Sequence, residues 1–382
     1  MNTSLLTNVK NEFVSKFQRA PVMVFSPGRI NIIGEHTDYN DGFVFPAAVD
    51  KGIIAAINKS DSDSCTAYAT DKEETFMFSL KNIGPLSQGS WQNYLLGVVA
   101  EIQKIGKSVG NFNIVFGGNI PVGSGMSSSA ALENSVVLGL NEVFKLGLSK
   151  HEMILISQQA EHNHVGVKCG IMDQYASMFG IENKALLLDC RTITSDSFEI
   201  DFQHHEFALI NTNVKHSLSD SAYNDRRSVC ESVAKMLNIP ALRDATELEL
   251  ASIKDKISPE NYQKVRYVIQ ENERAISASK AMQQGDLEAL GKLLYASHEG
   301  LQNQYKVSCD ELDFLVGQAK LNEHVLGARM MGGGFGGCTI NLVAKDGAEN
   351  FKAQASKAYK AQFNRACSIY DVKLSQGTHL IN

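Results

Sequence analysis

The sequence has no excess of positive charge and no long apolar run. Its 382 residues carry 36 Lys and Arg against 42 Asp and Glu, a formal net charge of −6. Proteins that bind nucleic-acid phosphates usually present a basic surface, so nucleic acid is not an expected partner. No stretch approaches the ~20 apolar residues of a membrane span, and Met1–Lys10 does not resemble a signal peptide. We therefore expect a cytoplasmic protein that does not bind membranes.

The cysteine pattern argues against both disulfides and a zinc site. The seven cysteines are scattered, odd in number and include no C-x-x-C pair, which favours reduced thiols. His162, His164 and Cys169 lie close in sequence, but they follow no standard zinc spacing and lack a second ligand pair. The pair His151-Glu152 lacks the second histidine of a zincin motif.

The stretch Pro121–Leu132 is rich in glycine and serine and stands between two apolar segments. The preceding residues, 113–116, are typical of a strand. Apolar residues follow at helical spacing: Leu132, Val136, Leu140 and Val143. The sequence therefore predicts a strand, a loop and the start of a helix.

The loop composition suits anion binding. Gly123 and Gly125 allow a tight turn, and Ser127, Ser128 and Ser129 are good N-cap residues. Free N–H groups at a helix start attract anions such as phosphate. An ordinary capped helix after a turn is the alternative. No Gly-Lys-Ser/Thr follows the glycines, so this is not a Walker A loop.

A second polar stretch, Ser26–Tyr39, follows a predicted strand at residues 22–25. Arg29 alternates with apolar residues, so an extended chain would send it and Asn31 to one face. Glu35, His36 and Asp38 follow Gly34 in a predicted loop. These side chains form either a solvated hairpin rim or a site for a polyol, whose hydroxyls can pair with carboxylates and imidazole.

Three further residues have both a structural and a functional interpretation. Glu161, near the end of a predicted helix at 150–165, is either a surface carboxylate or a ligand for Mg²⁺. Asp173, in the first turn of the next helix, either complements the helix dipole or acts as a base. Trp91 starts a predicted helix at 91–105; the sequence favours core packing over a nucleobase platform.

The segment Gly327–Val343 contains five glycines within six residues. Gly332, Gly334 and Gly337 satisfy G-x-G-x-x-G, but a predicted strand follows them where a dinucleotide-binding motif requires a helix. A Rossmann interpretation therefore fails. We expect the glycines to allow close backbone approach to the first loop or to a ligand.

Strand-rich and helix-rich regions divide the chain. Several strands precede the helix at 91–105, whereas residues 219–321 are mainly helical by spacing. We expect an α+β fold with a mixed sheet, an N-terminal domain over residues 1–200 and a C-terminal domain over 201–382, with a soft boundary near 190–205.

Together the polar stretch from Gly28 to Tyr39, the loop, Cys169–Gln174 and the glycine cluster resemble the motifs of the GHMP small-molecule kinases. The first of them resembles the signature of the galactokinases within that family. The resemblance covers nearly the whole chain. It implies a two-domain α/β architecture with the active site in the cleft between domains. It also implies phosphorylation by ATP of the anomeric hydroxyl of α-D-galactose, giving galactose 1-phosphate and ADP in galactose catabolism.

The resemblance also implies residue roles. Arg29 and Asp173 would flank the reacting hydroxyl. Galactose would be held by Glu35, His36, Asp38, Gly170, Asp173 and Tyr223. ATP would be held by Pro121, Val122, Gly123, Ser124, Gly125, Met126, Ser127, Ser128, Ser129 and Trp91. Mg²⁺ would be bound by Ser129 and Glu161. A monomer is expected, although no pattern in the sequence sets the oligomeric state.

Other interpretations remain open at this stage. Ser124 and Met126 stand where the family often has Ala and Leu, a change that leaves backbone phosphate contacts intact. A related kinase could instead act on N-acetylgalactosamine, arabinose, mevalonate or homoserine. A sugar sensor without turnover would be expected to have lost the loop or the base, and both are present here.

Overall fold

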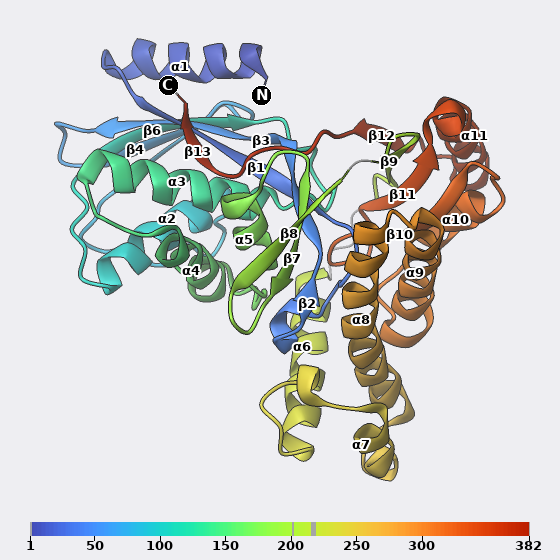
Figure 1. Ribbon diagram of the computed structural model, residues 1–382. Coiled ribbons are helices and arrows are strands. Elements are labelled where there is room, and N and C mark those ends of the chain that lie inside the picture. Colours follow the sequence, from blue (N-terminus) through green and yellow to red (C-terminus); the bar gives the residue numbers. More distant parts are fainter. Residues whose placement is uncertain (1, 201, 215–218, 382) are drawn as a thin grey trace.

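The structure is a computed structural model that describes residues 2–200, 202–214 and 219–381. Its helices and strands form two lobes joined side by side, with a helical arm projecting from their junction (Figure 1). The predicted α+β class is confirmed. Within the described ranges, no helix combines the length and the apolar character needed to cross a bilayer.

The first lobe is built on a six-stranded mixed sheet. Its strands, in spatial order, are β13 (His379–Ile381), β1 (Val22–Asn31), β3 (Pro46–Lys59), β6 (Phe112–Gly118), β4 (Cys65–Ala69) and β5 (Glu74–Phe78). Side chains of a strand alternate between faces, so one strand can contribute to two cores. In β1, Val24 belongs to the larger core, whereas Met23 and Phe25 pack with Val9 and Phe13.

Helices cover both faces of this sheet. The larger core lies under α2 (Trp91–Lys104), α3 (Ser128–Phe144), α4 (Lys150–Ala160) and α5 (Met172–Phe179). The opposite face is covered by α1 (Thr3–Phe17) (Figure 1). The predicted strand, loop and helix around Pro121 are confirmed as β6, the loop and α3. The loop lies against Met331 and Gly332, so the start of α3 faces the junction with the second lobe.

The second lobe contains a four-stranded antiparallel sheet. The order is β10 (Val325–Met330), β11 (Cys338–Ala344), β9 (His205–Asn211) and β12 (Ser368–Asp371). One face packs on α10 (Asp310–Lys320) and α11 (Lys345–Phe363), and the other on α8 (Pro259–Gln284) and α9 (Leu287–Gly300). A small sheet of β2 (Phe43–Val44), β7 (Lys184–Asp189) and β8 (Thr194–Glu199) lies beside the junction (Figure 1).

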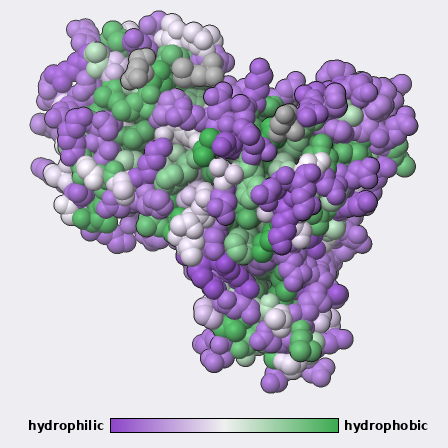
Figure 2. Space-filling view, viewed as in Figure 1, coloured by the Kyte–Doolittle hydropathy of each residue, from purple (hydrophilic) through white to green (hydrophobic). Residues whose placement is uncertain are grey.

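The arm consists of α6 (Ser219–Met236), α7 (Glu247–Ser252) and part of α8. It has its own core, which includes Cys230, Leu250 and Val265. Two π-helical turns, Glu161–Val165 and Leu301–Tyr305, follow α4 and α9. Polar residues cover most of the face seen in Figure 2, with neutral and hydrophobic residues gathered where the lobes meet.

Several elements were not predicted from the sequence. These are β8, β10, β13 and α7; β8 is largely polar (TSDSFE) and β13 has three residues, so neither carries a strong apolar pattern. The helix predicted at 150–165 ends at Ala160 and continues as the π-helical turn. The predicted domain boundary falls at residue 201, which lies outside the described residues, and the division into 1–200 and 201–382 stays a prediction.

Candidate active site

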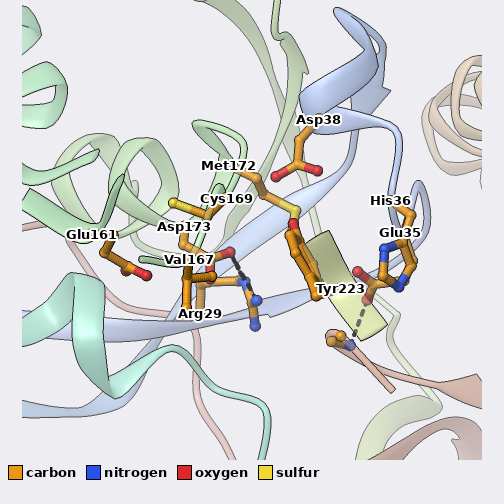
Figure 3. A pocket seen from close by; sticks show the side chains of 12 residues that line it. Arg29, Glu35, His36, Asp38, Glu161, Val167, Cys169, Met172, Asp173 and Tyr223 are labelled. Carbon is orange, nitrogen blue, oxygen red and sulfur yellow. Dashed lines mark hydrogen bonds and ion pairs between the residues drawn. The ribbon is translucent and has the colours of Figure 1, made fainter. Parts of the chain in front are cut away.

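Polar side chains of the first lobe, Tyr223 of the arm and two glycines of the second lobe line a cavity of about 120 Å³ at the junction. It is bounded by Arg29, Glu35, His36, Asp38, Glu161, Val167, Cys169, Met172, Asp173, Tyr223, Gly332 and Gly333 (Figure 3). Arg29 and Asn31, which were expected to share one face of the strand, have different surroundings. Arg29 lines the cavity, whereas Asn31 accepts a hydrogen bond from the backbone N–H of Phe45 at 3.2 Å.

Arg29, which is buried, and Asp173, which is partly buried, form an ion pair at one side of the cavity (Figure 3). The Nε and one terminal nitrogen of Arg29 each donate to Asp173 Oδ1 at 2.8 Å, and the other terminal nitrogen donates to the carbonyl of Gly125. Burial disfavours the charge of Arg29, but Asp173 and Glu35 outweigh it and raise the pKa of the guanidinium. Asp173 also accepts a hydrogen bond from Ser127 Oγ at 2.5 Å. The carboxylate is thus held in one orientation from two sides.

Glu35 is fixed from the second lobe. Its Oε1 accepts hydrogen bonds from the backbone N–H of Gly332 at 2.8 Å and from Arg329 at 3.1 Å. Arg329 in β10 is 0% exposed and also donates to the carbonyls of Ile32 and Met330 at 2.7 and 2.5 Å. One buried guanidinium therefore links the end of β1, Glu35 and the glycine-rich segment.

Asp38 lies at the far side of the cavity from Glu161 (Figure 3). Burial, with the nearby charges of Asp173 and Glu35, raises the pKa of its carboxyl to about 7. Gly170 lies against this carboxyl, and a Cβ at residue 170 would come within 2.2 Å of it. Glycine at this position therefore leaves room for Asp38; Gly170 is not among the residues that line the cavity, and its sugar-binding role stays a prediction.

His36 adopts a left-handed backbone conformation, with φ of 64°, which is uncommon for a residue other than glycine. Its ring lies 5.3 Å from the ring of Tyr223, centroid to centroid, and both line the cavity. Burial, reinforced by Arg226, lowers the pKa of His36 to about 3, so the ring is neutral at physiological pH.

A second cavity, of about 350 Å³, lies over the glycine- and serine-rich loop. The loop lines it with Pro121, Gly123, Ser124, Gly125, Met126, Ser127, Ser128 and Ser129, and six residues line both cavities: Arg29, Val167, Asp173, Tyr223, Gly332 and Gly333. The two cavities therefore meet at the Arg29–Asp173 pair.

One prediction for the loop is wrong, and the ATP contacts predicted for Val122 and Trp91 stay predictions. The expected side-chain cap at the start of α3 is wrong: Ser127, with φ of 56°, makes no capping hydrogen bond because its hydroxyl pairs with Asp173. Val122 is 78% exposed and lines a neighbouring groove beside Phe335. Trp91 is 6% exposed; it packs on Phe116 and donates to Glu74 at 2.7 Å. This core position, which the sequence favoured, gives no support to an adenine contact, and Tyr94 lines the loop cavity instead.

Two acidic residues lie together near the start of α3. Glu161 and Glu133 both accept hydrogen bonds from Gln174 Nε2, at 3.2 and 3.4 Å. Burial, with the charge of Glu161, raises the pKa of Glu133 well above its usual value, and Glu133 Oε1 is buried without a hydrogen-bond partner. Within the described part of the chain, no group of three or more His, Cys, Asp or Glu side chains is arranged around a metal position.

The sequence did not reveal some residues that build the site. Arg329 and Glu133 were not singled out, because nothing local distinguishes a buried charge from a surface one. Val167, Cys169 and Met172 also line the first cavity. Only their position within or beside the Cys169–Gln174 motif could have indicated this.

The glycine cluster approaches the loop as expected. A Cβ on Gly125, whose φ is +72°, would lie 3.0 Å from the carbonyl oxygen of Met331, and Gly332 contacts Gly125 in turn. The backbones of the two segments therefore pack directly against each other, and any side chain at this contact would separate them.

Comparison with known proteins identifies the class of this fold and site. The chain matches family models described as "GHMP kinases N terminal domain" over residues 93–181 and "GHMP kinases C terminal" over 278–361. A mevalonate kinase from Methanococcus jannaschii, 18% identical, shares the fold with a TM-score of 0.65 over 94% of this chain and 99% of its own. The class is that of the GHMP kinases.

Closer similarities narrow the class. Residues 11–59 match the "Galactokinase galactose-binding signature". The galactokinase of Clostridium beijerinckii is 40% identical over 98% of both chains, and that of Thermotoga neapolitana is 39% identical over 94% of this chain and 99% of its own. The structure of Lactococcus lactis galactokinase complexed with galactose is 33% identical, with a TM-score of 0.94 over 98% of this chain and 100% of its own. The chain belongs to the galactokinase family.

Proposed function

We propose that this chain transfers the γ-phosphoryl group of ATP to the anomeric hydroxyl of α-D-galactose, giving galactose 1-phosphate and ADP. The observation that carries the proposal is the meeting of two cavities at Arg29 and Asp173. One cavity is lined by carboxylates, imidazole and phenol, which suit a polyhydroxylated sugar. The other lies over a helix start, which suits phosphate. Family membership and the galactose-binding signature support the same assignment.

Asp173 is the proposed base. Phosphoryl transfer depends mainly on positioning and charge neutralisation, and the protein needs to remove only the hydroxyl proton. Arg29 holds Asp173 through two nitrogens, so the carboxylate is oriented for its role. Arg29 also lines the loop cavity and can stabilise negative charge on the transferring group.

The other polar residues would bind the sugar. We assign this role to Glu35, His36, Asp38 and Tyr223, with Gly170 leaving space for Asp38. A buried carboxylate that loses its hydroxyl partner is destabilised by about 1–3 kcal/mol, which can discriminate against an epimer of galactose.

Mg²⁺ is proposed as the cofactor, bound between nucleotide phosphates and the protein. Ser129 lines the loop cavity, and Glu161 lines the sugar cavity beside Glu133, whose Oε1 has no hydrogen-bond partner. Hydroxyl and carboxylate oxygens are the ligands that Mg²⁺ prefers, so the residues present fit the ion. Bound there, it would neutralise phosphate charge.

The direct test is ADP release with Mg²⁺-ATP and equal concentrations of galactose, glucose, N-acetylgalactosamine and mevalonate. We expect rapid release with galactose and little with the others. Turnover with another of these compounds instead of galactose would mean that the protein is a kinase but that the proposed substrate is wrong. Heat of galactose binding without ADP release would instead indicate a sugar sensor.

A further inference from the structure

A row of buried polar groups runs from the sugar cavity into the helical arm. His36 Nδ1 lies 2.8 Å from Tyr39 Oη, Tyr39 Oη lies 2.7 Å from Tyr305 Oη, and Tyr305 Oη lies 3.5 Å from Cys230 Sγ. We call these four residues the His36 relay. None of them except His36 lines the cavity, so the proposed sugar contacts do not explain the other three.

The relay is largely enclosed and comes from three separate segments of the chain. His36 follows Gly34 in the loop after β1, Tyr39 lies in the 3₁₀ turn Asp38–Asn40, Tyr305 ends the π-helical turn after α9, and Cys230 is in α6. Tyr305 and Cys230 are 0% and 1% exposed, and His36 is 3% exposed. Arg226 anchors the π-helical turn by donating to the backbone carbonyl of Tyr305 at 2.9 Å.

The other ring nitrogen of His36 makes no hydrogen bond of normal geometry. Nε2 is buried, and the backbone of Gly333, which also lines the cavity proposed for galactose, acts on the ring and opposes the lowering of its pKa by burial. A buried polar atom without a partner is destabilising, so such an atom at a cavity wall is a candidate ligand contact. Figure 3 shows the His36 ring among the side chains that surround this cavity.

We propose that Tyr39 and Tyr305 are positioning residues that fix the tautomer of His36, so that Nε2 carries the proton and donates a hydrogen bond to a galactose hydroxyl. This inference rests on the proposed function, because it names what the relay does at the same site. In this proposal His36 donates a hydrogen bond to the sugar, whereas the neighbouring carboxylates mainly accept hydrogen bonds from its hydroxyls.

The direction of the relay follows from hydrogen-bond chemistry. A neutral imidazole has one nitrogen that donates and one that accepts. The Tyr39 hydroxyl also contacts Tyr305, whose own hydroxyl faces a thiol, and sulfur is only a weak acceptor. Tyr305 therefore donates towards Tyr39 rather than towards Cys230, and Tyr39 donates to Nδ1. With Nδ1 accepting, the ring proton must be on Nε2, facing the cavity.

Packing keeps the ring in place while the relay sets its proton. The His36 ring centroid lies 4.9 Å from that of Tyr305 and 5.3 Å from that of Tyr223. A substitution of Tyr39 by Phe would keep the aromatic ring and remove only the hydroxyl. It is therefore the variant that separates proton placement from packing.

The first experiment is tautomer determination by ¹⁵N NMR on histidine-labelled protein without ligands, with His36→Gln used only to assign the signals. We expect His36 with a protonated Nε2 and a bare Nδ1. In Tyr39→Phe the Nε2-protonated population should fall. A protonated Nδ1 in the unaltered protein, or an unchanged tautomer in Tyr39→Phe, would overturn the proposal. Because no turnover is needed, this result is independent of whether the chain phosphorylates galactose.

The second experiment measures steady-state kinetics with galactose and with its 2-, 3-, 4- and 6-deoxy analogues. We expect Tyr39→Phe to raise KM for galactose roughly 10-fold and Tyr305→Phe roughly 3-fold, with kcat changed less than about 3-fold, the scale of one neutral hydrogen bond. One deoxy analogue should lose about 10-fold in kcat/KM with the unaltered chain, and this penalty should shrink in Tyr39→Phe.

A matched control is Tyr359→Phe. Tyr359 is also buried and its hydroxyl donates to the carbonyl of Thr212 at 2.8 Å, but it lies in α11, within the core of the second lobe, and does not line the cavity. It should lower thermal stability without changing KM or the deoxy-sugar pattern. If both relay variants behave like this control, the relay is only structural and the proposal fails. If the unaltered protein releases no ADP with galactose, the proposed function fails while the NMR result still decides the tautomer.

Discussion

The two cavities that meet at Arg29 and Asp173 are built in different ways. The sugar cavity is lined largely by charged and aromatic side chains, and some of these are held by a partner far away in sequence, as Glu35 is held by Arg329. The loop cavity consists mainly of backbone and small side chains, many of them partly exposed. Specific recognition of a neutral sugar requires placed side chains, whereas phosphate binding requires amide N–H groups that almost any sequence with the right turn can supply.

The largest effect is expected where the cavities meet. Asp173→Asn keeps the size of the side chain and removes the proposed base, so kcat should fall by about 10²–10⁴-fold with little change in galactose or ATP binding. Rapid-quench kinetics together with calorimetry would measure both. Asp196→Asn, at an exposed position in β8, serves as the control and should leave kcat unchanged. Substantial turnover by Asp173→Asn would mean that Asp173 only positions the hydroxyl.

A large loss of stability is expected on the sugar side. Arg329→Met removes the guanidinium that pairs with Glu35 and with backbone carbonyls, leaving a buried carboxylate uncompensated. Breaking a buried pair in this way destabilises by about 3–5 kcal/mol. Urea unfolding would measure it, with Arg365→Met at an exposed position as the control. A loss below about 1 kcal/mol would show that Glu35 does not depend on this partner.

Asp38 should make stability depend on pH. Its native pKa is about 7, whereas an unfolded Asp titrates near ~4. Between these values the native state binds the proton more tightly, so the free energy of unfolding falls as pH rises through this window. Asp38→Asn should therefore be more stable than the unaltered protein by about 1–3 kcal/mol at pH 8, with the gain disappearing towards pH 4.

Thermal unfolding of both proteins across pH 4–8 would measure this difference. Galactose turnover by Asp38→Asn should fall at the same time, since a sugar contact is altered. A pH-independent difference in stability would show that the Asp38 carboxyl titrates normally.

The smallest effect is expected in the loop. Ser128→Ala changes an exposed hydroxyl while the backbone stays in place, so KM for ATP should change less than about 3-fold. Gly125→Ala is the contrasting variant, because a Cβ at φ of +72° would press on the carbonyl of Met331. It should raise KM for ATP well beyond the Ser128→Ala value. An equal change in KM for ATP in the two variants would mean that the loop binds ATP through side chains.

The two cavities also differ in how well the sequence predicted them. Local patterns were sufficient for the loop: the apolar spacing predicted β6 and α3, and the glycines predicted a tight turn between them. For the sugar cavity the motifs identified Arg29, Glu35, His36, Asp38 and Asp173, and the structure brings all five to one cavity. Which partner holds each of them could not be inferred.

Physical reasons explain why the sequence was wrong about one residue of the site and could not decide on others. Ser127 has the composition of a helix cap, but a tertiary contact with Asp173 takes its hydroxyl. Trp91 has the size and position for either role that the sequence allowed; its packing on Phe116 agrees with the core position that the sequence favoured, and the adenine contact stays a prediction. Arg329 and Glu133 look like ordinary surface charges until burial is known.

The sequence by itself determined the α+β class, the strand, loop and helix around the glycines, and the motifs that assign the chain to its family. These follow from side-chain periodicity and short-range turn chemistry, which act over a few residues. Only the tertiary structure decided how β1 and α5 bring Arg29 to Asp173 within the first lobe, how Arg329 of the second lobe holds Glu35, and how Tyr39 and Tyr305 align behind His36. Such contacts join residues up to about 300 positions apart, as 35 and 329 are, and burial gives them their energy by removing water from charged and polar groups.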